Sequence, residues 1–237
     1  DDSNEENRVH SAKAFGMLIH LHRGTPYIYQ GEELGMTGAH FTELSQYRDL
    51  ESINAYRQRV EEAKVQSGES MMDSLALFGR DNARTPMQWD GSKYAGFTAA
   101  DAKTEPWLSV NPNHVEINAA AQFDDPDSVY AFYKKLVNLR HNSAVVSAGE
   151  WALVDDDDEQ VYAFTRTLTN ADGTAERMLV AINLTGRHAA LPKPVADLLA
   201  DGVSEDRIIL STYDAIHSAK SLANGELAGW EGVVVEL

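Results

Sequence analysis

The amino-terminal part of the chain shows a helical hydrophobic pattern followed by an extended one. Apolar residues recur at helical spacing from Val9 to Leu21, after a Ser3–Glu6 segment that has the form of a capping box. Residues 25–31 (Thr-Pro-Tyr-Ile-Tyr-Gln-Gly) come next, and because their apolar residues do not alternate with polar ones they predict a parallel strand buried on both faces. A helix that leads into such a strand is the repeating unit of an α/β sheet or barrel. The predicted buried face of the helix contains Val9, Ala12, Phe15, Gly16 and Ile19.

The middle of the chain is polar and then irregular. Residues 43–67 predict a helix with a thin apolar stripe, and residues 70–78 predict a short apolar helix or turn. Residues 79–123 are rich in Asn, Pro, Trp and Gly and predict a long irregular segment, which in a compact protein is generally functional or disordered. Four aromatic side chains argue against disorder, namely Trp89, Tyr94, Phe97 and Trp107.

The carboxy-terminal part changes from a helix to short β-rich runs. Asp125-Pro126 has the cap and first-turn residues of a helix that ends at His141-Asn142. Turn signals such as Asn224-Gly225 separate the runs that follow, and short strands at these intervals predict an antiparallel β-sandwich. We therefore expect two domains, residues 1–142 and residues 143–237. The predicted strands are residues 150–154, 161–168, 177–184, 207–212 and 233–237.

Composition narrows the function classes. The formal net charge of −17 disfavours nucleic acid and anionic membranes as partners, and no stretch approaches the roughly 18 apolar residues of a spanning helix. The absence of Cys excludes disulfides and thiolate metal sites and fits a cytoplasmic location. The acidic run at residues 155–159 is typical of a solvated hairpin tip, so no metal or cofactor is predicted. The first residues lack an initiator Met and signal-peptide features, so we expect a cut inside a longer chain.

Polar residues at the end of the predicted strand are the first candidates for a site. Gln30, Glu32 and Glu33 follow the strand directly, and in an α/β barrel the carboxy-terminal strand ends form the active-site face. The alternative is that these groups hold the loop through hydrogen bonds to the backbone. We favour that alternative for Glu32 and Glu33.

The second candidate segment is Arg80-Asp81-Asn82-Ala83-Arg84-Thr85-Pro86-Met87-Gln88-Trp89. Two arginines with Asp and Asn between them can orient each other and direct a planar guanidinium at hydroxyls or a carboxylate. Met87 and Trp89 add apolar surface suited to a sugar ring. The alternative is an internal salt-bridge cluster that holds the loop; we favour binding for Arg80 and the structural role for Arg84. The residues by themselves identify no reaction.

At these two segments the sequence resembles the oligo-1,6-glucosidase and α-glucosidase branch of glycoside hydrolase family 13, the α-amylase family. The matching stretches are residues 24–36 (Gly-Thr-Pro-Tyr-Ile-Tyr-Gln-Gly-Glu-Glu-Leu-Gly-Met) and residues 80–89. Residues 49–57, 95–97 and 106–113 add supporting matches, so the resemblance extends over roughly residues 8–142.

The resemblance implies an α+β fragment. Residues 1–142 would be the end of a catalytic TIM (β/α) barrel, with its seventh helix, eighth strand, a long insertion and eighth helix. Residues 143–237 would be the accessory β-sandwich. The family hydrolyses terminal α-1,6- or α-1,4-linked glucose with retention, using an Asp nucleophile, a Glu acid/base and a third Asp. None of those motifs occurs here, so this chain is expected to contain no catalytic carboxylate and to be inactive alone.

The resemblance also implies binding roles. Arg80 would hold the non-reducing-end glucose of an oligosaccharide substrate, Arg84 would support Arg80, and Gln30 and Glu32 would border the pocket. The preference between α-1,6 and α-1,4 bonds depends on residues outside this chain.

Several alternatives remain at this stage. Sucrose isomerases and trehalose synthases share parts of the pattern, and the heavy chains of some amino-acid transporters keep the fold without catalysis. A carbohydrate-binding module in residues 143–237 would need an exposed aromatic platform, which Trp151, Tyr162, Tyr213 and Trp230 are too scattered to predict. A barrel strand without neighbours would expose residues 27–29, so we also expect self-association.

Overall fold

The protein is described by a computed structural model that covers residues 1–155 and 157–237, so the acidic run at residues 155–159 lies partly outside the described residues. The chain forms two compact units. The first comprises residues 1–33 and 126–237, and the second comprises residues 34–125. Within the described residues, no helix has the length and apolar character needed to cross a membrane.

A five-stranded antiparallel sheet forms the centre of the first unit, in the order β1-β2-β3-β7-β5. The register of the β2–β3 hairpin runs from Val161↔Asn183 to Thr169↔Ala175. These strands confirm the predicted antiparallel β structure, with ends shifted by one or two residues. The strands are β1 (Glu150–Leu153), β2 (Val161–Thr169), β3 (Ala175–Asn183), β5 (Ile208–Ser211) and β7 (Gly232–Glu236).

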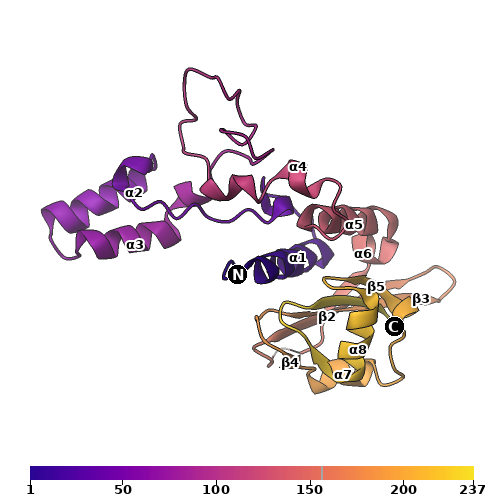
Figure 1. Ribbon diagram of the computed structural model, residues 1–237. Coiled ribbons are helices and arrows are strands. Elements are labelled where there is room, and N and C mark those ends of the chain that lie inside the picture. Colours follow the sequence, from indigo (N-terminus) through magenta and orange to yellow (C-terminus); the bar gives the residue numbers. More distant parts are fainter. Residues whose placement is uncertain (156) are drawn as a thin grey trace. The chain divides into compact units, whose positions relative to one another are not determined.

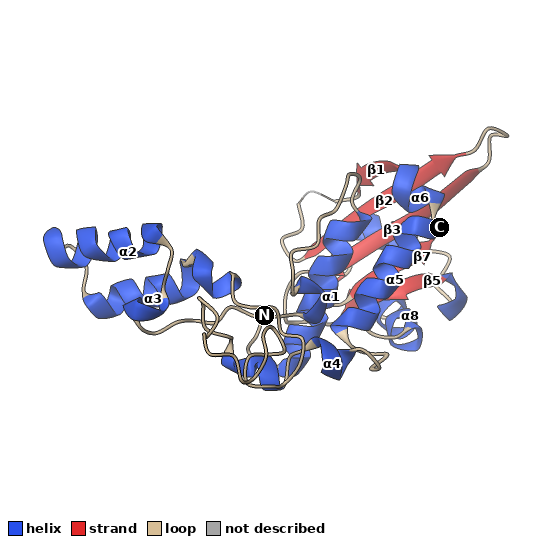
Figure 2. Cartoon of the chain, turned by 90° about the horizontal axis from the view of Figure 1, so that it is seen from above, coloured by secondary structure: helices blue, strands red, loops and turns tan. Residues whose placement is uncertain are grey.

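Helices cover one face of this sheet, as Figures 1 and 2 show. They are α1 (Glu5–Leu21), α5 (Val129–Asn142) and α6 (Ala144–Ala148). Alternate residues of the central strands point toward them, because successive side chains of a strand face opposite sides. The core on this face includes Met17 and Leu21 of α1, Leu136 of α5, and Val180 and Val234 of the sheet.

The opposite face of the sheet carries the second layer of the sandwich. It consists of a two-stranded sheet, β4 (Ala189–Ala190) with β6 (Glu226–Leu227), and the helices α7 (Lys193–Leu198) and α8 (Ala215–Ala223). Its core includes Leu179, Val233 and Val235 of the large sheet. The sequence did not predict these four elements, because two-residue strands and short helices leave no clear periodicity.

Helix α1 has a different N-cap and a different buried face from those predicted. Asn4, not Ser3, is the N-cap, and its side chain accepts a hydrogen bond of 2.8 Å from the backbone N–H of Asn7. Phe15 and Ile19 are exposed, and the helix is buried through Ala14, Met17 and Leu21 instead. The hydrophobic residues of α1 span more than one face, so packing against α5 and the sheet decides which of them is covered.

Two further predictions in the first unit are wrong. Helix α5 begins at Val129 rather than at Asp125-Pro126, because Ser128 is its N-cap and the Ser128 hydroxyl accepts the N–H of Ala131 at 3.0 Å. Residues 25–31 do not form a buried strand: no ladder includes them, and Tyr27 is 84% exposed. A parallel strand needs partners on both sides to be buried, and no described strand lies beside this segment.

The second unit is helical at one end and irregular at the other. Helix α2 (Leu50–Tyr56) continues into a π-helical turn (η3, Arg57–Glu62) and is followed by α3 (Gly68–Phe78), which lies beside it (Figure 1). Beyond α3 the chain is mostly loop, as predicted. Short helices interrupt the loops at η2 (Leu44–Gln46), η4 (Arg80–Ala83), η5 (Pro112–Val115) and α4 (Ala119–Gln122), whereas η1 (Glu32–Leu34) lies where the two units join in sequence. The small core contains Phe41, Tyr47, Met71, Leu75 and Leu108.

Candidate functional site

The Arg80 guanidinium is held by two carboxylates of the α2 start. Its Nε donates to Asp49 Oδ2 at 2.7 Å and its Nη2 to Asp49 Oδ1 at 2.9 Å. Nη2 also lies 2.7 Å from Glu51 Oε2. The hydrogen bonds from Arg80 are the main reason why the pKa of Asp49 is lowered. The Arg80 side chain remains 52% exposed, so the group is fixed in orientation and still open to solvent.

Local backbone contacts explain why these groups meet. Asp49 is the N-cap of α2 and accepts the N–H of Glu51 at 3.1 Å. The buried Asp81 carboxylate accepts the backbone N–H groups of Arg48 and Asp49 at 2.6 and 2.7 Å. The turn that carries Arg80 is thereby tied to the start of α2. Sequence reasoning did not identify Asp49 and Glu51 as partners of Arg80, although a cap followed by an acidic first turn was visible.

The residues between the two arginines act on the backbone and not on the arginines. Asn82 is buried, accepts the N–H of Phe41 at 2.9 Å and donates to the carbonyl of Leu75 at 2.8 Å. Within the described residues, the side chains of Asp81 and Asn82 therefore bond to backbone groups rather than to the two guanidinium groups. The physical reason is that a buried carboxylate or amide needs hydrogen-bond partners, and the backbone groups are the nearest ones.

Arg84 and Arg80 differ in the partners of their guanidinium groups. Arg84 is exposed, and its guanidinium makes no hydrogen bond or ion pair within the described part of the chain, although its charge helps to lower the pKa of Asp49. Arg80 instead has the internal ion pairs of the structural alternative, while half of its side chain remains accessible. Trp89 is exposed and Met87 is buried, so of these two side chains the Trp89 indole is the one that offers apolar surface to a ligand.

Gln30, Glu32 and Glu33 lie in the first unit. Glu32 accepts the N–H of Tyr29 at 2.9 Å and the hydroxyl of Tyr133 at 3.2 Å, and burial together with Glu32 raises the pKa of Tyr133. Glu33 accepts the N–H of Gly31 at 2.8 Å. The two glutamates therefore hold the loop, as favoured from the sequence, whereas Gln30 is exposed.

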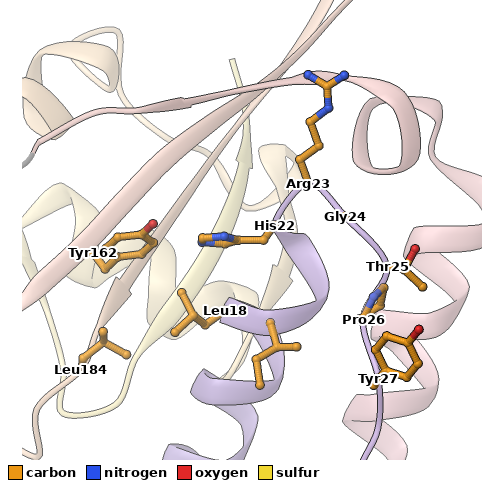
Figure 3. Close-up of a pocket in the computed structure, with 10 residues that line it drawn as sticks. Leu18, His22, Arg23, Gly24, Thr25, Pro26, Tyr27, Tyr162 and Leu184 are labelled. Atoms are coloured by element: carbon orange, nitrogen blue, oxygen red, sulfur yellow. The ribbon is translucent and has the colours of Figure 1, made fainter.

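A pocket of about 590 Å³ in the first unit is mostly apolar (Figure 3). Leu18, His22, Tyr162 and Leu184 line one side, and residues 25–27 line the other. Burial, followed by the nearby Arg166, lowers the pKa of His22. Its lining contains no carboxylate, so it does not offer the carboxylate pair that a glycosidase uses.

Ser218, His217 and Glu231 meet beneath α8 but do not form a catalytic triad. The Ser218 hydroxyl donates directly to Glu231 at 2.6 Å, and His217 Nε2 lies 3.7 Å from the same carboxylate. A nucleophilic serine needs the histidine as its base, and here Ser218 is fully buried. No group of three or more potential metal-binding side chains occurs among residues 1–155 and 157–237.

Comparison with known proteins places the chain among glycoside hydrolases. The family profile described as "Alpha amylase, catalytic domain" matches residues 1–149. An oligo-1,6-glucosidase from Parageobacillus thermoglucosidasius is 41% identical over 230 residues, which are 97% of this chain and 38% of that protein. An α-glucosidase from Pediococcus pentosaceus is 52% identical over 171 residues, or 72% of this chain and 30% of that protein. The solved structure of the trehalulose synthase from Pseudomonas mesoacidophila MX-45 matches with a TM-score of 0.79 and 36% identity over 99% of this chain and 39% of that one.

The chain thus spans well under half the length of these relatives. The profile match covers all of the region in which the sequence resembles the family, and the relatives extend the similarity into the β-rich part. The chain belongs to the α-amylase family of glycoside hydrolases, glycoside hydrolase family 13.

Proposed function

We propose that the chain is the carboxy-terminal part of a retaining α-glucosidase that removes terminal α-1,6- or α-1,4-linked glucose from oligosaccharides in the cytoplasm. Similarity to an oligo-1,6-glucosidase over 97% of the chain carries this proposal. Residues 1–142 supply the end of the catalytic barrel, and residues 143–237 form the accessory domain. The nucleophile and the acid/base lie outside this chain, so its own contribution is binding.

Arg80 and Arg84 of the second unit are the proposed sugar-binding residues, and Gln30 and Glu32 of the first unit are further proposed substrate-binding residues. The pairing of Arg80 with Asp49 fixes its guanidinium before substrate arrives, which lowers the entropic cost of binding. Arg84 has its donors available for a substrate hydroxyl. Holding the terminal glucose in place raises the rate by keeping the reacting atoms in line.

A second candidate is an isomerising or transglycosylating enzyme, favoured by the similarity to trehalulose synthase. Both candidates use the same carboxylate chemistry and differ in whether water or a sugar hydroxyl accepts the glucosyl group. Product analysis with sucrose and with isomaltose distinguishes them, because hydrolysis releases glucose from isomaltose whereas isomerisation converts sucrose to another disaccharide.

We expect this chain to release no p-nitrophenol from p-nitrophenyl α-glucoside, because it lacks the catalytic carboxylates. A longer protein that also carries the preceding part of the barrel is expected to be active. In that longer protein, Arg80→Ala and Arg84→Ala should each lower kcat/KM by about 100-fold, from the lost charge-assisted hydrogen bonds. Arg57→Ala, which removes an exposed arginine of the same unit, serves as the control. Turnover by the short chain alone would contradict the proposal and direct attention to Glu32 and Glu33.

We also expect the chain to self-associate through residues 27–29, whose aromatic and aliphatic side chains are exposed without strand partners. Light scattering should show a mass that rises with concentration, and Tyr27→Ser with Tyr29→Ser should reduce it. Leu50→Ser, at an exposed apolar residue of the second unit, is the matched control. A concentration-independent monomer with strongly protected amides at residues 27–29 would contradict this expectation.

A further inference from the structure

The mostly apolar pocket at the end of α1 has the size of a small-molecule site, and the proposed function does not use it. Its volume of about 590 Å³ lies within the range of about 300–1,000 Å³ that holds such ligands. Tyr162 and Leu184 lie opposite residues 25–27, with Leu18 and His22 between them (Figure 3). All of these residues belong to the first unit, so the pocket is formed within one unit of the chain.

The walls of the pocket suit a flat aromatic ring. The imidazole of His22 stacks on the phenol ring of Tyr162, with ring centroids 5.6 Å apart and an interplanar angle of 19°. Leu18 and Leu184 add aliphatic surface beside these rings, and Pro26 faces them from the loop. A planar aromatic group gains from such surroundings through burial of apolar area and offset stacking. The lining therefore favours an aromatic ligand over a polyhydroxylated one, whose hydroxyl groups need several polar partners.

The polar side chains of the lining can donate hydrogen bonds and include no carboxylate. In the described part of the chain, neither the Tyr162 hydroxyl nor the Arg23 guanidinium has a hydrogen-bond partner. Burial raises the pKa of Tyr162, so its hydroxyl keeps its proton. Thr25 adds a second hydroxyl to the lining. Such donors match a carboxylate, which accepts hydrogen bonds at both of its oxygens.

Positive charge is concentrated at this end of α1, although the chain as a whole has a net charge of −17. Arg140 Nη1 donates to the carbonyl of His20 at 2.9 Å, and Arg166 Nη1 donates to that of Leu21 at 2.7 Å. After burial, the charges of Arg140 and Arg23 are the next causes of the lowered pKa of Arg166, so the three guanidinium groups lie near one another. Their three full charges outweigh the negative partial charge of about half a unit at the helix end. The local field therefore attracts an anion.

We propose that this pocket binds a small aromatic carboxylate, with its ring against Leu18 and Leu184 and its carboxylate on the Tyr162 hydroxyl and the Arg23 guanidinium. The inference goes beyond the proposed glucosidase activity and is independent of it, because that activity assigns no role to these four residues.

The test is a titration of the full chain, labelled at the δ1 methyl groups of its isoleucines, with phenylacetate and with the neutral phenylacetamide. Ile19 lines the pocket, whereas Ile216 is exposed on α8 and lies outside this lining. The ring current of the bound phenyl group should shift the Ile19 signal, identified by its absence from Ile19→Val, in a saturable way. The Ile216 signal should stay in place. The carboxylate should bind about fivefold more tightly than the amide, because the nearby guanidinium groups act on its charge.

Two conservative variants separate the roles of the polar groups. Arg23→Gln should weaken binding of phenylacetate by about threefold and leave that of phenylacetamide nearly unchanged, because only the anion interacts with the lost charge. Tyr162→Phe should weaken binding of both ligands by about fivefold through loss of the hydroxyl. Arg177→Gln, at an exposed arginine of β3 outside the pocket lining, is the matched control and should bind as the parent chain does.

An Ile19 signal that does not respond to phenylacetate, or that moves together with Ile216 without saturation, would overturn the inference. Equal affinities of the Arg23→Gln and Arg177→Gln chains for phenylacetate would remove Arg23 from the site. Equal affinities of the parent chain for phenylacetate and phenylacetamide would overturn the preference for an anion. If the Ile19 signal depends on the concentration of the chain and not on phenylacetate, a second copy covers the pocket and the inference fails.

Discussion

Replacing Arg166 with alanine is expected to lower the free energy of unfolding by about 3 kcal/mol. Arg166 lies on β2 and is fully buried, with Nη1 donating to the carbonyl of Leu21 at 2.7 Å and Nη2 to that of Gly149 at 2.8 Å. These carbonyls belong to the carboxy-terminal ends of α1 and α6, which attract positive charge. Alanine would leave both carbonyls without this partner and leave a cavity between the helices and the sheet.

No carboxylate pairs with this guanidinium in the described part of the chain. Burial lowers the pKa of Arg166, and the positive charges of Arg140 and Arg23 act in the same direction. A buried charge is tolerated only with hydrogen bonds of good geometry, and the two helix ends supply them. The buried guanidinium of Arg166 therefore joins the ends of α1 and α6 to the sheet through its two hydrogen bonds.

Urea denaturation followed by circular dichroism measures this effect. Arg166→Met fills much of the volume without restoring the hydrogen bonds, so it should lose less stability than Arg166→Ala. Arg177→Ala, at an exposed position on β3, should change the free energy of unfolding by less than about 0.5 kcal/mol. A loss below about 1 kcal/mol for Arg166→Ala would show that the buried arginine is dispensable.

The sequence predicted those elements whose signals are local. Strands β2 and β3 and helices α3 and α5 follow from hydrophobic patterns and turn residues, and the structure has them close to the predicted bounds. The exact cap residues could not be predicted, because several neighbouring polar side chains can cap the same helix. At α5 the N-cap is Ser128 and not Asp125. Periodicity could not decide the buried face of α1, because that face depends on elements more than a hundred residues away.

The sequence predicted which types of residue form the candidate site, but it did not predict which of them are in contact. The motif around Arg80 identified the guanidinium, but its partner Asp49 lies 31 residues earlier in the chain. Arg166 was missed for a similar reason, since an arginine within a strand is normally read as an exposed residue. Long-range hydrogen bonds leave no periodic signal in the sequence.

Acid is expected to weaken the fold through three histidines of the α1 region. His20 is only 2% exposed, and neither of its ring nitrogens has a hydrogen-bond partner in the described structure. Burial lowers the pKa of His20, against an opposing effect of Glu32, and Arg140 adds to the lowering. Burial is also the main cause of the lowered pKa of His10, with Lys13 next, and of His22.

The groups around His10 and His22 act in both directions. The Thr212 carbonyl and Glu6 raise the pKa of His10, whereas His217, on the far side of the stacked Tyr213 ring, lowers it. The His22 ring packs among aromatic side chains, and the charge of Arg166 lowers its pKa further. The net effect is a lowered pKa at both His10 and His22. Together with His20, all three imidazoles therefore favour the neutral form in the folded chain.

The direction of the pH effect follows from proton counting. Below about pH 6.5 the unfolded chain binds protons at these histidines, whereas in the folded chain they stay neutral to a lower pH. The free energy of unfolding is therefore highest above that pH and declines as the pH falls. Between about pH 7.5 and about pH 5 the free energy of unfolding should fall by on the order of 2 kcal/mol. The lowered pKa of Asp49 acts in a separate window, because stability from a carboxylate is lost only below about pH 4.

Urea denaturation at several pH values tests this expectation with one substitution. His20→Phe keeps a ring in the buried site beside Tyr133 but cannot take up a proton, so its stability should fall less steeply between neutral and mildly acid pH. His141→Gln removes an exposed histidine near the end of α5 and should leave the slope unchanged. If His20→Phe has the same slope as the parent chain, protonation of His20 does not control the acid sensitivity. Equal stability of the parent chain at pH 5 and above pH 7 would refute the neutral buried state for all three histidines, because linkage requires a loss wherever the unfolded chain binds more protons.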